Sequence, residues 1–213
     1  MRVIRKWVLL VILAITSLSS EGVAFGAGAF AASAGIRSVN WKSVRVPGAV
    51  CGNPRPIQLH SGKAKIPTPP GVSAGTPEVW IFASAPHYGD LFGPGHDIAA
   101  LNVWCDNTGG TADGQVQNSW VIYSMSAGRL RTIGTLTPQQ PSTKDTHIPY
   151  FDGLPGGFKI KLKTITAKEI WYGSEDGTCC PSGRATTIWT YAHGAFTPKT
   201  TSLHNPRGNQ SGS

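Results

Sequence analysis

The stretch SWVIYSMSAGRLRTIGTL, residues 119–136, has the pattern of two β-strands joined by a tight turn. Apolar, β-branched and aromatic residues are frequent in 119–126 and 130–136, and Ala127-Gly128 stands between these two segments. Such residues are enriched in strands, and a short connection that contains glycine is typical of a β-hairpin. The stretch therefore predicts an antiparallel hairpin with its turn near Ala127-Gly128.

Four further segments have a similar composition and are bounded by Gly, Pro, Asn or Asp. They are 79–85, 98–105, 158–165 and 185–192. No segment sustains a helical period of apolar residues, although 167–171 could form one turn. The 213 residues, with 26 Gly and 16 Pro, suit one ordinary domain with frequent turns. We expect a mainly β fold, or an α+β fold with a minor helix, in a single disulfide-stapled antiparallel domain at 41–197.

Residues 1–31 have the order of a secretory signal peptide. A positively charged start precedes a short apolar run from Trp7 to Leu18, and small residues with candidate cleavage sites follow. The run is shorter than the roughly 18 residues of a membrane span, so we expect no stable membrane anchor after processing. We expect a linker at 32–40 and a disordered tail at 198–213, where apolar residues are scarce. The predicted location is secreted or in the cell envelope.

Four cysteines in an exported chain imply a disulfide framework with three possible pairings. Neighbouring Cα atoms are about 3.8 Å apart, below the roughly 4.4 Å lower edge of relaxed disulfides. We therefore expect Cys179 and Cys180 to bond separately to Cys51 and Cys105, as staples of the domain. The alternative is a Cys51–Cys105 bond beside a strained Cys179–Cys180 bond, which would be more reducible and could serve as a switch. Thioredoxin-like and zinc sites require other spacings.

Lysines alternate with apolar residues in FKIKLKTI, residues 158–165. If this stretch is one strand, Lys159, Lys161 and Lys163 line one face. They form a candidate binding face for an anionic polymer, and the alternative is a solvated face that discourages edge pairing. The net charge of +8 is consistent with an anionic partner. The six tryptophans after Trp7 offer a second hypothesis, in which exposed rings stack on a glycan, although burial in strands is the commoner use.

The glycine-rich stretch YGDLFGPGHDIAAL, residues 88–101, carries acidic groups before a predicted strand. Asp90 and Asp97 are weak candidates for calcium, because two carboxylates are too few and the alternate positions between them offer no side-chain oxygen. We therefore expect no metal and no cofactor. An alternative use of this region is acid/base catalysis in a secreted hydrolase, with a site near His87, Asp90, His96 and Asp97.

Three stretches together resemble a known family: YGDLFGPGHDIAALNVWC, WYGSEDGTCCPSG and ATTIWTYAHGAF. Over roughly residues 88–196, the chain is similar to the mycobacterial LppP/LprE-type lipoproteins, small exported actinobacterial proteins. The resemblance implies an envelope or secreted protein, and it offers no catalytic residues to carry over. Two departures matter here. Pro94 replaces the family's usual Asp, which weakens any metal site, and the lipid-attachment cysteine is missing, which implies a released or wall-held protein.

No hydrolase motif of the G-x-S-x-G or H-E-x-x-H type occurs in the sequence. We therefore expect a monomeric, non-catalytic protein that binds an anionic cell-wall polymer or glycan, and we expect no nucleic acid as a partner. Two alternatives remain open. One is the secreted hydrolase described above, and the other is a secreted inhibitor that acts through an exposed loop such as 66–78.

Overall fold

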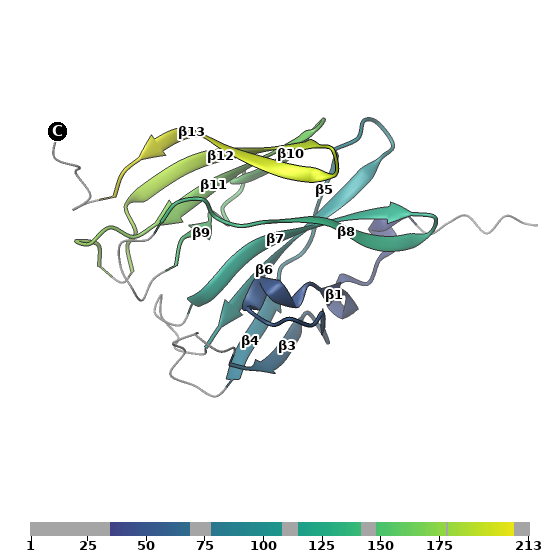
Figure 1. Cartoon of the computed structure of the whole chain (residues 1–213), viewed down its shortest axis with the longest axis horizontal. Coiled ribbons are helices and arrows are strands. Elements are labelled where there is room, and N and C mark those ends of the chain that lie inside the picture. Colours follow the sequence, from purple (N-terminus) through teal and green to yellow (C-terminus); the bar gives the residue numbers. More distant parts are fainter. Residues whose placement is uncertain (1–34, 69–77, 108–114, 142–147, 178, 207–213) are drawn as a thin grey trace, which may run out of the picture. The chain divides into compact units, whose positions relative to one another are not determined.

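The computed structural model describes residues 35–68, 78–107, 115–141, 148–177 and 179–206 (Figure 1). All of these residues belong to one compact unit, Ser33–Ser213. The predicted signal peptide, 1–31, lies outside the described residues. Within the described ranges, no helix has the length and apolar character needed to cross a bilayer.

Antiparallel β-sheets form this unit, which confirms the predicted fold class. The strands are β1 (Arg45–Val46), β2 (Ile57–Gln58), β3 (Lys63–Pro67), β4 (Glu78–Ala83), β5 (His87–Asp90), β6 (Asp97–Asp106), β7 (Gln115–Ser126), β8 (Arg129–Leu136), β9 (Tyr150–Phe151), β10 (Phe158–Lys161), β11 (Thr164–Trp171), β12 (Gly183–Ala192) and β13 (Ala195–His204). The helical elements among the described residues are three 3-10 turns, η1 (Ile36–Ser38), η2 (Trp41–Ser43) and η3 (Gly48–Cys51). Residues 167–171, considered for a helical turn, belong to β11.

Two larger sheets and one small sheet organise the strands. The six-stranded sheet has the order β3-β4-β6-β7-β8, with β5 paired to β6. The five-stranded sheet has the order β10-β11-β12-β13, with β9 paired to β11. Strands β1 and β2 pair with each other. In Figure 1 the five-stranded sheet, green to yellow, lies above the teal strands β7 and β8 of the six-stranded sheet.

The six-stranded sheet is the middle layer of three. On one face, Ile81 and Leu101 belong to a buried cluster with Val46 and Leu59 of the amino-terminal segment. On the other face, a second buried cluster joins it to the five-stranded sheet. That cluster contains Leu91, Ile98, Ala100, Trp120, Ile122, Leu136, Phe151, Phe158, Ile165, Ala167 and Trp189. Because both faces of β6 are covered, its sequence DIAALNVWCD is apolar at consecutive positions instead of at alternate ones.

The predicted hairpin is confirmed as β7 and β8. Ser126 pairs with Arg129, so Ala127 and Gly128 are the two residues of the turn. Their φ angles are 49° and 72°, in the left-handed region. Positive φ at both central residues is the type I′ arrangement, which matches the twist of the flanking strands.

Replacing Ala127 by Asn is expected to raise the free energy of unfolding by about 0.5–1 kcal/mol, because alanine is strained at positive φ and asparagine tolerates it. The midpoint of urea unfolding measures the change. Ala195→Asn is the control, since Ala195 is exposed in β13 and has no positive φ. A lower midpoint for Ala127→Asn than for the parent protein would contradict the expected turn geometry.

The single strand predicted at 158–165 is wrong. β10 ends at Lys161, and Leu162 and Lys163 form the turn that leads into β11, with Lys161 paired to Thr164. Lys163 has a φ of 56° in this turn. Leu162 is therefore 60% exposed instead of lying in the core. The sequence hides the turn because it contains no Gly, Pro, Asn or Asp, the residues that usually mark one.

The predicted linker and tail are also corrected in part. Ile36, within the expected linker at 32–40, is buried in the cluster beneath the six-stranded sheet. β13 continues to His204, so the domain extends past the expected boundary at 197. Almost every β13 side chain is exposed, because β13 is an edge strand that is paired through its backbone to β12. The scarcity of apolar residues therefore did not prevent it from forming a strand.

Candidate functional site

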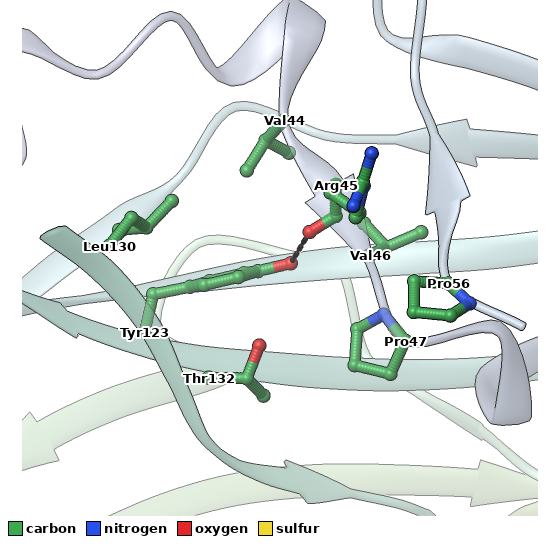
Figure 2. Close-up of a pocket in the computed structure, with 8 residues that line it drawn as sticks. All are labelled: Val44, Arg45, Val46, Pro47, Pro56, Tyr123, Leu130 and Thr132. Atoms are coloured by element: carbon green, nitrogen blue, oxygen red, sulfur yellow. Dashed lines mark hydrogen bonds between the residues drawn. The ribbon is translucent and has the colours of Figure 1, made fainter.

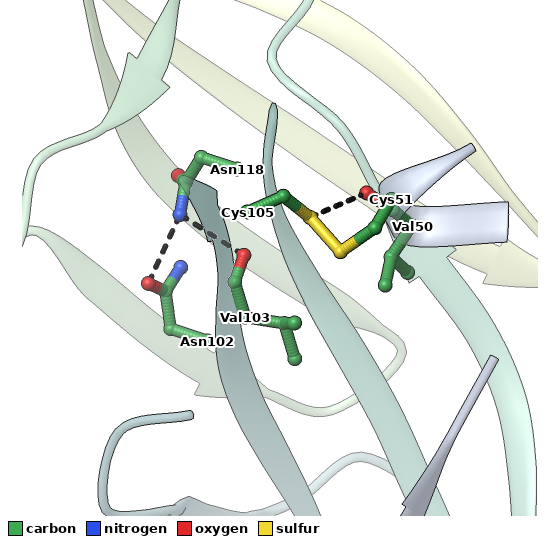
Figure 3. The surroundings of a disulfide bond; sticks show 6 residues. All are labelled: Val50, Cys51, Asn102, Val103, Cys105 and Asn118. Carbon is green, nitrogen blue, oxygen red and sulfur yellow. Dashed lines mark hydrogen bonds between the residues drawn. A yellow bond between two sulfur atoms is a disulfide. The ribbon is translucent and has the colours of Figure 1, made fainter. Parts of the chain in front are cut away.

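The first cysteine pair holds the amino-terminal segment against the six-stranded sheet. Cys51 ends η3 and is bonded to Cys105 of β6, with their Cα atoms 5.6 Å apart. Their exposed fractions are 1% and 0%. Figure 3 shows the bond beside Val50, whose carbonyl oxygen lies 3.1 Å from the Cys105 sulfur. This buried bond is a structural staple.

The second pair is a bond between neighbours, Cys179–Cys180, in the loop from β11 to β12. The preferred prediction, in which each of these cysteines reaches a different distant partner, is therefore wrong. The alternative pairing is the one present. The physical reason is that Cys51 and Cys105 lie within bonding distance of each other, while Cys179 and Cys180 are exposed to solvent.

The candidate acid/base residues divide between two faces of the β5–β6 hairpin. The His87 ring contacts Trp120 and Phe158 at centroid distances of 5.1 and 5.6 Å, on the side of the five-stranded sheet. Partial burial there lowers the pKa of His87. Asp90 is three residues further along the strand, so its side chain faces the opposite side, together with its cross-strand partner Asp97. The structure therefore does not bring His87 to the two carboxylates.

The Asp97 carboxylate instead contacts Arg37, a residue of the predicted linker at 32–40. Arg37 donates a hydrogen bond of 2.5 Å from Nε to Oδ2 of Asp97, and its guanidinium lies 4.6 Å from the Tyr88 ring centroid. The hydrogen bond from Arg37 lowers the pKa of Asp97. Arg37, Asp90, His96 and Asp97 line a cavity of about 460 Å³. An ion-paired carboxylate with a lowered pKa is a poor general acid, which disfavours that role for Asp97.

Among the residues that the structure describes, no three His, Cys, Asp or Glu side chains are grouped so that they could hold a metal ion. The lysine stripe expected on one strand is divided as well. Lys159 and Lys161 are exposed on β10, whereas Lys163 lies in the turn. The basic face on β10 therefore contains two lysines instead of the three that the sequence predicted.

A different basic face lies on β3 and β4. Lys63 pairs in register with Phe82, and Phe82 pairs with Trp104 of β6. Lys65 pairs with Trp80 in the neighbouring row. Cross-strand partners, and residues two apart on one strand, share a face of the sheet. We call these five residues the aromatic–lysine surface.

The two rings on β4 lie side by side within this surface. The centroids of Trp80 and Phe82 are 6.2 Å apart, and their planes differ by only 13°. The Lys65 ammonium lies 5.2 Å from the Trp80 centroid, and the Lys63 ammonium lies 5.6 Å from the Phe82 centroid. These are the distances of cation–π contacts. The result is a pair of nearly parallel rings with a lysine ammonium over each.

The aromatic–lysine surface is open because the five-stranded sheet covers only part of the face. The buried cluster between the two large sheets includes residues of β6, β7 and β8 but none of β3 or β4. Lys63 and Lys65 are exposed, and the three rings are partly exposed. Trp104 contacts Tyr150 of β9 at a centroid distance of 5.6 Å. The aromatic–lysine surface therefore ends at Trp104, where the five-stranded sheet begins to cover this face.

The structure leaves two of the six tryptophans after Trp7 partly exposed. Trp120, Trp171 and Trp189 are buried in strands, and Trp41 is buried in η2. Trp80 and Trp104 are partly exposed and belong to the same surface. The signal in the sequence was the alternation of Lys63 and Lys65 in β3, for which no strand was predicted. The loop expected at 66–78 includes the last two residues of this strand.

Two further cavities are lined mainly by residues of the amino-terminal half. One, of about 440 Å³, adjoins the aromatic–lysine surface and shares Lys63 and Phe82 with it. The other, of about 370 Å³, is largely apolar and is lined by Val44, Arg45, Val46, Pro47, Pro56, Tyr123, Leu130 and Thr132 (Figure 2). There the Tyr123 hydroxyl donates a hydrogen bond of 3.0 Å to the Arg45 carbonyl oxygen, and burial raises the pKa of Tyr123. That hydroxyl is thus engaged in holding the amino-terminal segment.

No family model matches the chain, and neither a curated protein nor a solved structure shows significant similarity to it. The functional interpretation therefore depends on the chemistry of the molecule's own surfaces. Of these, the aromatic–lysine surface has open rings and cations together, beside a cavity. By fold and site, the chain is an antiparallel β protein with an open aromatic and basic face.

Proposed function

We propose that this is an extracytoplasmic, non-catalytic protein that binds an acidic glycan through the aromatic–lysine surface. The observation that carries the proposal is the pair of nearly parallel rings of Trp80 and Phe82 with a lysine ammonium over each. The C–H face of a sugar ring stacks on aromatic rings, and ammonium groups pair with carboxylate or phosphate groups. Side-by-side rings on one strand suit consecutive units of a polymer.

The charges around the surface favour a glycan of moderate acidity. Lys65 forms an ion pair with Glu78, which lies on β4 two residues before Trp80. This acidic neighbour reduces the net positive charge that a ligand would meet. We therefore expect stacking to supply most of the affinity and charge pairing to supply selectivity, with a modest loss of binding as salt is added.

The cellular location is part of the same proposal. The signal-peptide pattern at 1–31, the two disulfides and the resemblance to exported actinobacterial envelope proteins support it. The glycan would then be a component of the cell wall or of the exterior. The sequence resemblance concerns 88–196. Lys63, Lys65, Trp80 and Phe82 precede that range, and Trp104 is the one residue of the aromatic–lysine surface within it.

Binding to purified soluble polysaccharides tests the proposal. The probes are polygalacturonate, a phosphodiester-linked wall teichoic acid and a neutral β-glucan, with affinity measured by tryptophan fluorescence and by affinity electrophoresis. The double variant Trp80→Ala/Phe82→Ala is expected to weaken binding about tenfold or more, because stacked contacts contribute about 1.4 kcal/mol or more in sum. Lys63→Ala/Lys65→Ala should weaken binding to the two acidic polymers and not to the neutral one.

Two matched variants serve as controls. Phe92→Ala removes another exposed ring, and Lys159→Ala/Lys161→Ala removes the lysines that the sequence favoured. Both are expected to bind as the parent protein does. If the Lys159/Lys161 variant alone loses binding, the ligand occupies β10 instead. If the parent protein binds none of the three polymers, the proposal fails.

A further inference from the structure

The loop from β11 to β12 presents two sulfur atoms to solvent. Cys179 and Cys180 are both exposed, whereas Cys51 and Cys105 are buried. An external thiolate can therefore approach Cys179–Cys180 directly, and it can reach the other disulfide only after the core opens. Accessibility is the first requirement for thiol–disulfide exchange.

The bond between neighbours contributes little to holding the fold. A disulfide stabilises a protein chiefly by restricting the unfolded chain, and this effect grows with the number of residues in the closed loop. The sequence separation is 1 for Cys179–Cys180 and 54 for Cys51–Cys105. The Cα atoms of Cys179 and Cys180 are also only 3.7 Å apart, closer than in relaxed disulfides, which favours the reduced state.

The loop has anchors that do not depend on the sulfur bond. Asp176 is buried and accepts hydrogen bonds from the N–H groups of Gly173 and Ser182, both at 2.8 Å. It also accepts one from the Ser182 hydroxyl at 2.7 Å. Arg184 donates to the carbonyl oxygens of Pro181 and Gly183 at 2.7 and 2.8 Å. These contacts flank the cysteines on both sides, so they can hold the loop when the sulfur bond is open.

From these observations we propose that Cys179–Cys180 is a reversible two-electron redox site, which exchanges with an external dithiol while the domain stays folded. One thiolate of the reductant attacks a sulfur of the pair, and the S–S bond breaks to release the other cysteine as a thiolate. The second thiolate of the reductant then attacks the mixed disulfide and frees the attached cysteine. The reductant loses two electrons and two protons and becomes a disulfide, and the chain gains them as two thiols.

The two thiols formed in this way are adjacent, which gives the reduced state a chemical signature. Cys51 and Cys105 are bonded to each other, so within the chain they offer no thiol to a mixed disulfide. A trivalent arsenical, which bonds two neighbouring thiols at once, should therefore attach to the reduced loop and not to the oxidised one. This property distinguishes a reversible site from random surface thiols.

The test is graded reduction of the folded, full-length protein by dithiothreitol without denaturant. Free thiols are alkylated, the chain is digested without further reduction, and the peptides are identified by mass spectrometry. We expect Cys179 and Cys180 to be alkylated at about a tenfold lower dithiothreitol concentration than Cys51 and Cys105. The melting temperature should stay within about 2 °C of the oxidised value until the second pair opens. After dithiothreitol is removed, phenylarsine oxide should add once per reduced chain. In a reduced sample that has received no arsenical, exposure to air should restore the bond.

The variant Cys179→Ser/Cys180→Ser should fold, lose the early alkylation and take up no arsenical. The inference is overturned if both disulfides open at the same dithiothreitol concentration, or if Cys179 and Cys180 become reactive only when the domain melts. It is also overturned if the peptide map of the untreated protein lacks a Cys179–Cys180 bond. Polysaccharide binding by the same variant is a separate readout, so failure of either proposal leaves the other standing.

Discussion

Replacing both Cys51 and Cys105 by alanine is expected to lower the free energy of unfolding by about 4 kcal/mol, the value that the chain-entropy model gives for a loop of this length. The bond joins residues separated by 54 positions and is fully enclosed. It also secures the end of η3 to the end of β6, in the buried cluster that the amino-terminal segment shares with the six-stranded sheet. A loss of this size is a large part of the stability of an ordinary domain.

Urea unfolding of the variant and the parent protein measures this effect through the midpoint and the slope. The matched control is Cys179→Ala/Cys180→Ala, which removes a bond of the same chemistry that closes no loop. We expect that control to cost less than about 1 kcal/mol. Equal losses in the two variants would contradict the assignment of one bond to structure and the other to exchange.

Replacement of Glu169 should also lower the free energy of unfolding by a large amount. Glu169 lies in β11 on the side that faces the six-stranded sheet, and its exposed fraction is 0%. Its Oε2 atom accepts hydrogen bonds from the backbone N–H groups of Gln139 and Gln140, at 2.7 and 3.2 Å. These glutamines belong to the connection from β8 to β9, so the carboxylate fastens the chain where it passes from one large sheet to the other.

Glu169→Ala is expected to lower the free energy of unfolding by about 2–3 kcal/mol, because two part-buried N–H groups lose their acceptor. Glu169→Gln keeps a carbonyl oxygen at this position and should be tolerated. Chemical unfolding at one pH compares the two variants. If glutamine proves as costly as alanine, the hydrogen bonds to the connection do not explain the role of Glu169.

Glu169 also makes the free energy of unfolding depend on pH, and the direction of this dependence follows from its pKa shift. Burial raises the pKa of Glu169 above its ordinary value of 4.5, and the Thr187 hydroxyl and the two N–H groups offset this only in part. In the pH range between the unfolded and folded pKa values, the folded protein holds more protons than the unfolded chain. Stability from this group is therefore present below the unfolded pKa and is lost as pH rises through the folded pKa.

Glu169→Gln removes this titration and leaves the other titrating groups in place. The free energy of unfolding of Glu169→Gln, relative to that of the parent protein, should therefore increase as pH rises from 4 to 8. Unfolding curves recorded at several pH values give this difference directly. A difference that stays constant across that range would mean that Glu169 has the same pKa in the folded and unfolded states.

The aromatic–lysine surface could not be predicted from the sequence, because it depends on which strands pair with each other. Lys63 and Lys65 are unremarkable surface lysines until β3 pairs with β4 and places them beside Phe82 and Trp80. For a partner such as a glycan or an anionic polymer, the sequence offered Lys159, Lys161 and Lys163 as the candidate binding face. A turn without glycine or proline ends that strand at Lys161. Glu169 had a visible signal, since it interrupts the apolar phase of Ile165, Ala167 and Trp171 in β11.

Most strands and the β7–β8 turn could be predicted from the sequence, because local composition and two-residue periodicity decide these features. The four cysteines likewise indicated up to two disulfides. The pairing of Cys51 with Cys105, the partial exposure of Trp80 and Trp104, and the contact of Glu169 with the connection between the sheets follow from the tertiary structure. Each of these depends on which strands become neighbours and how far one sheet covers the other. Such contacts join residues distant in sequence, and a local pattern cannot encode them.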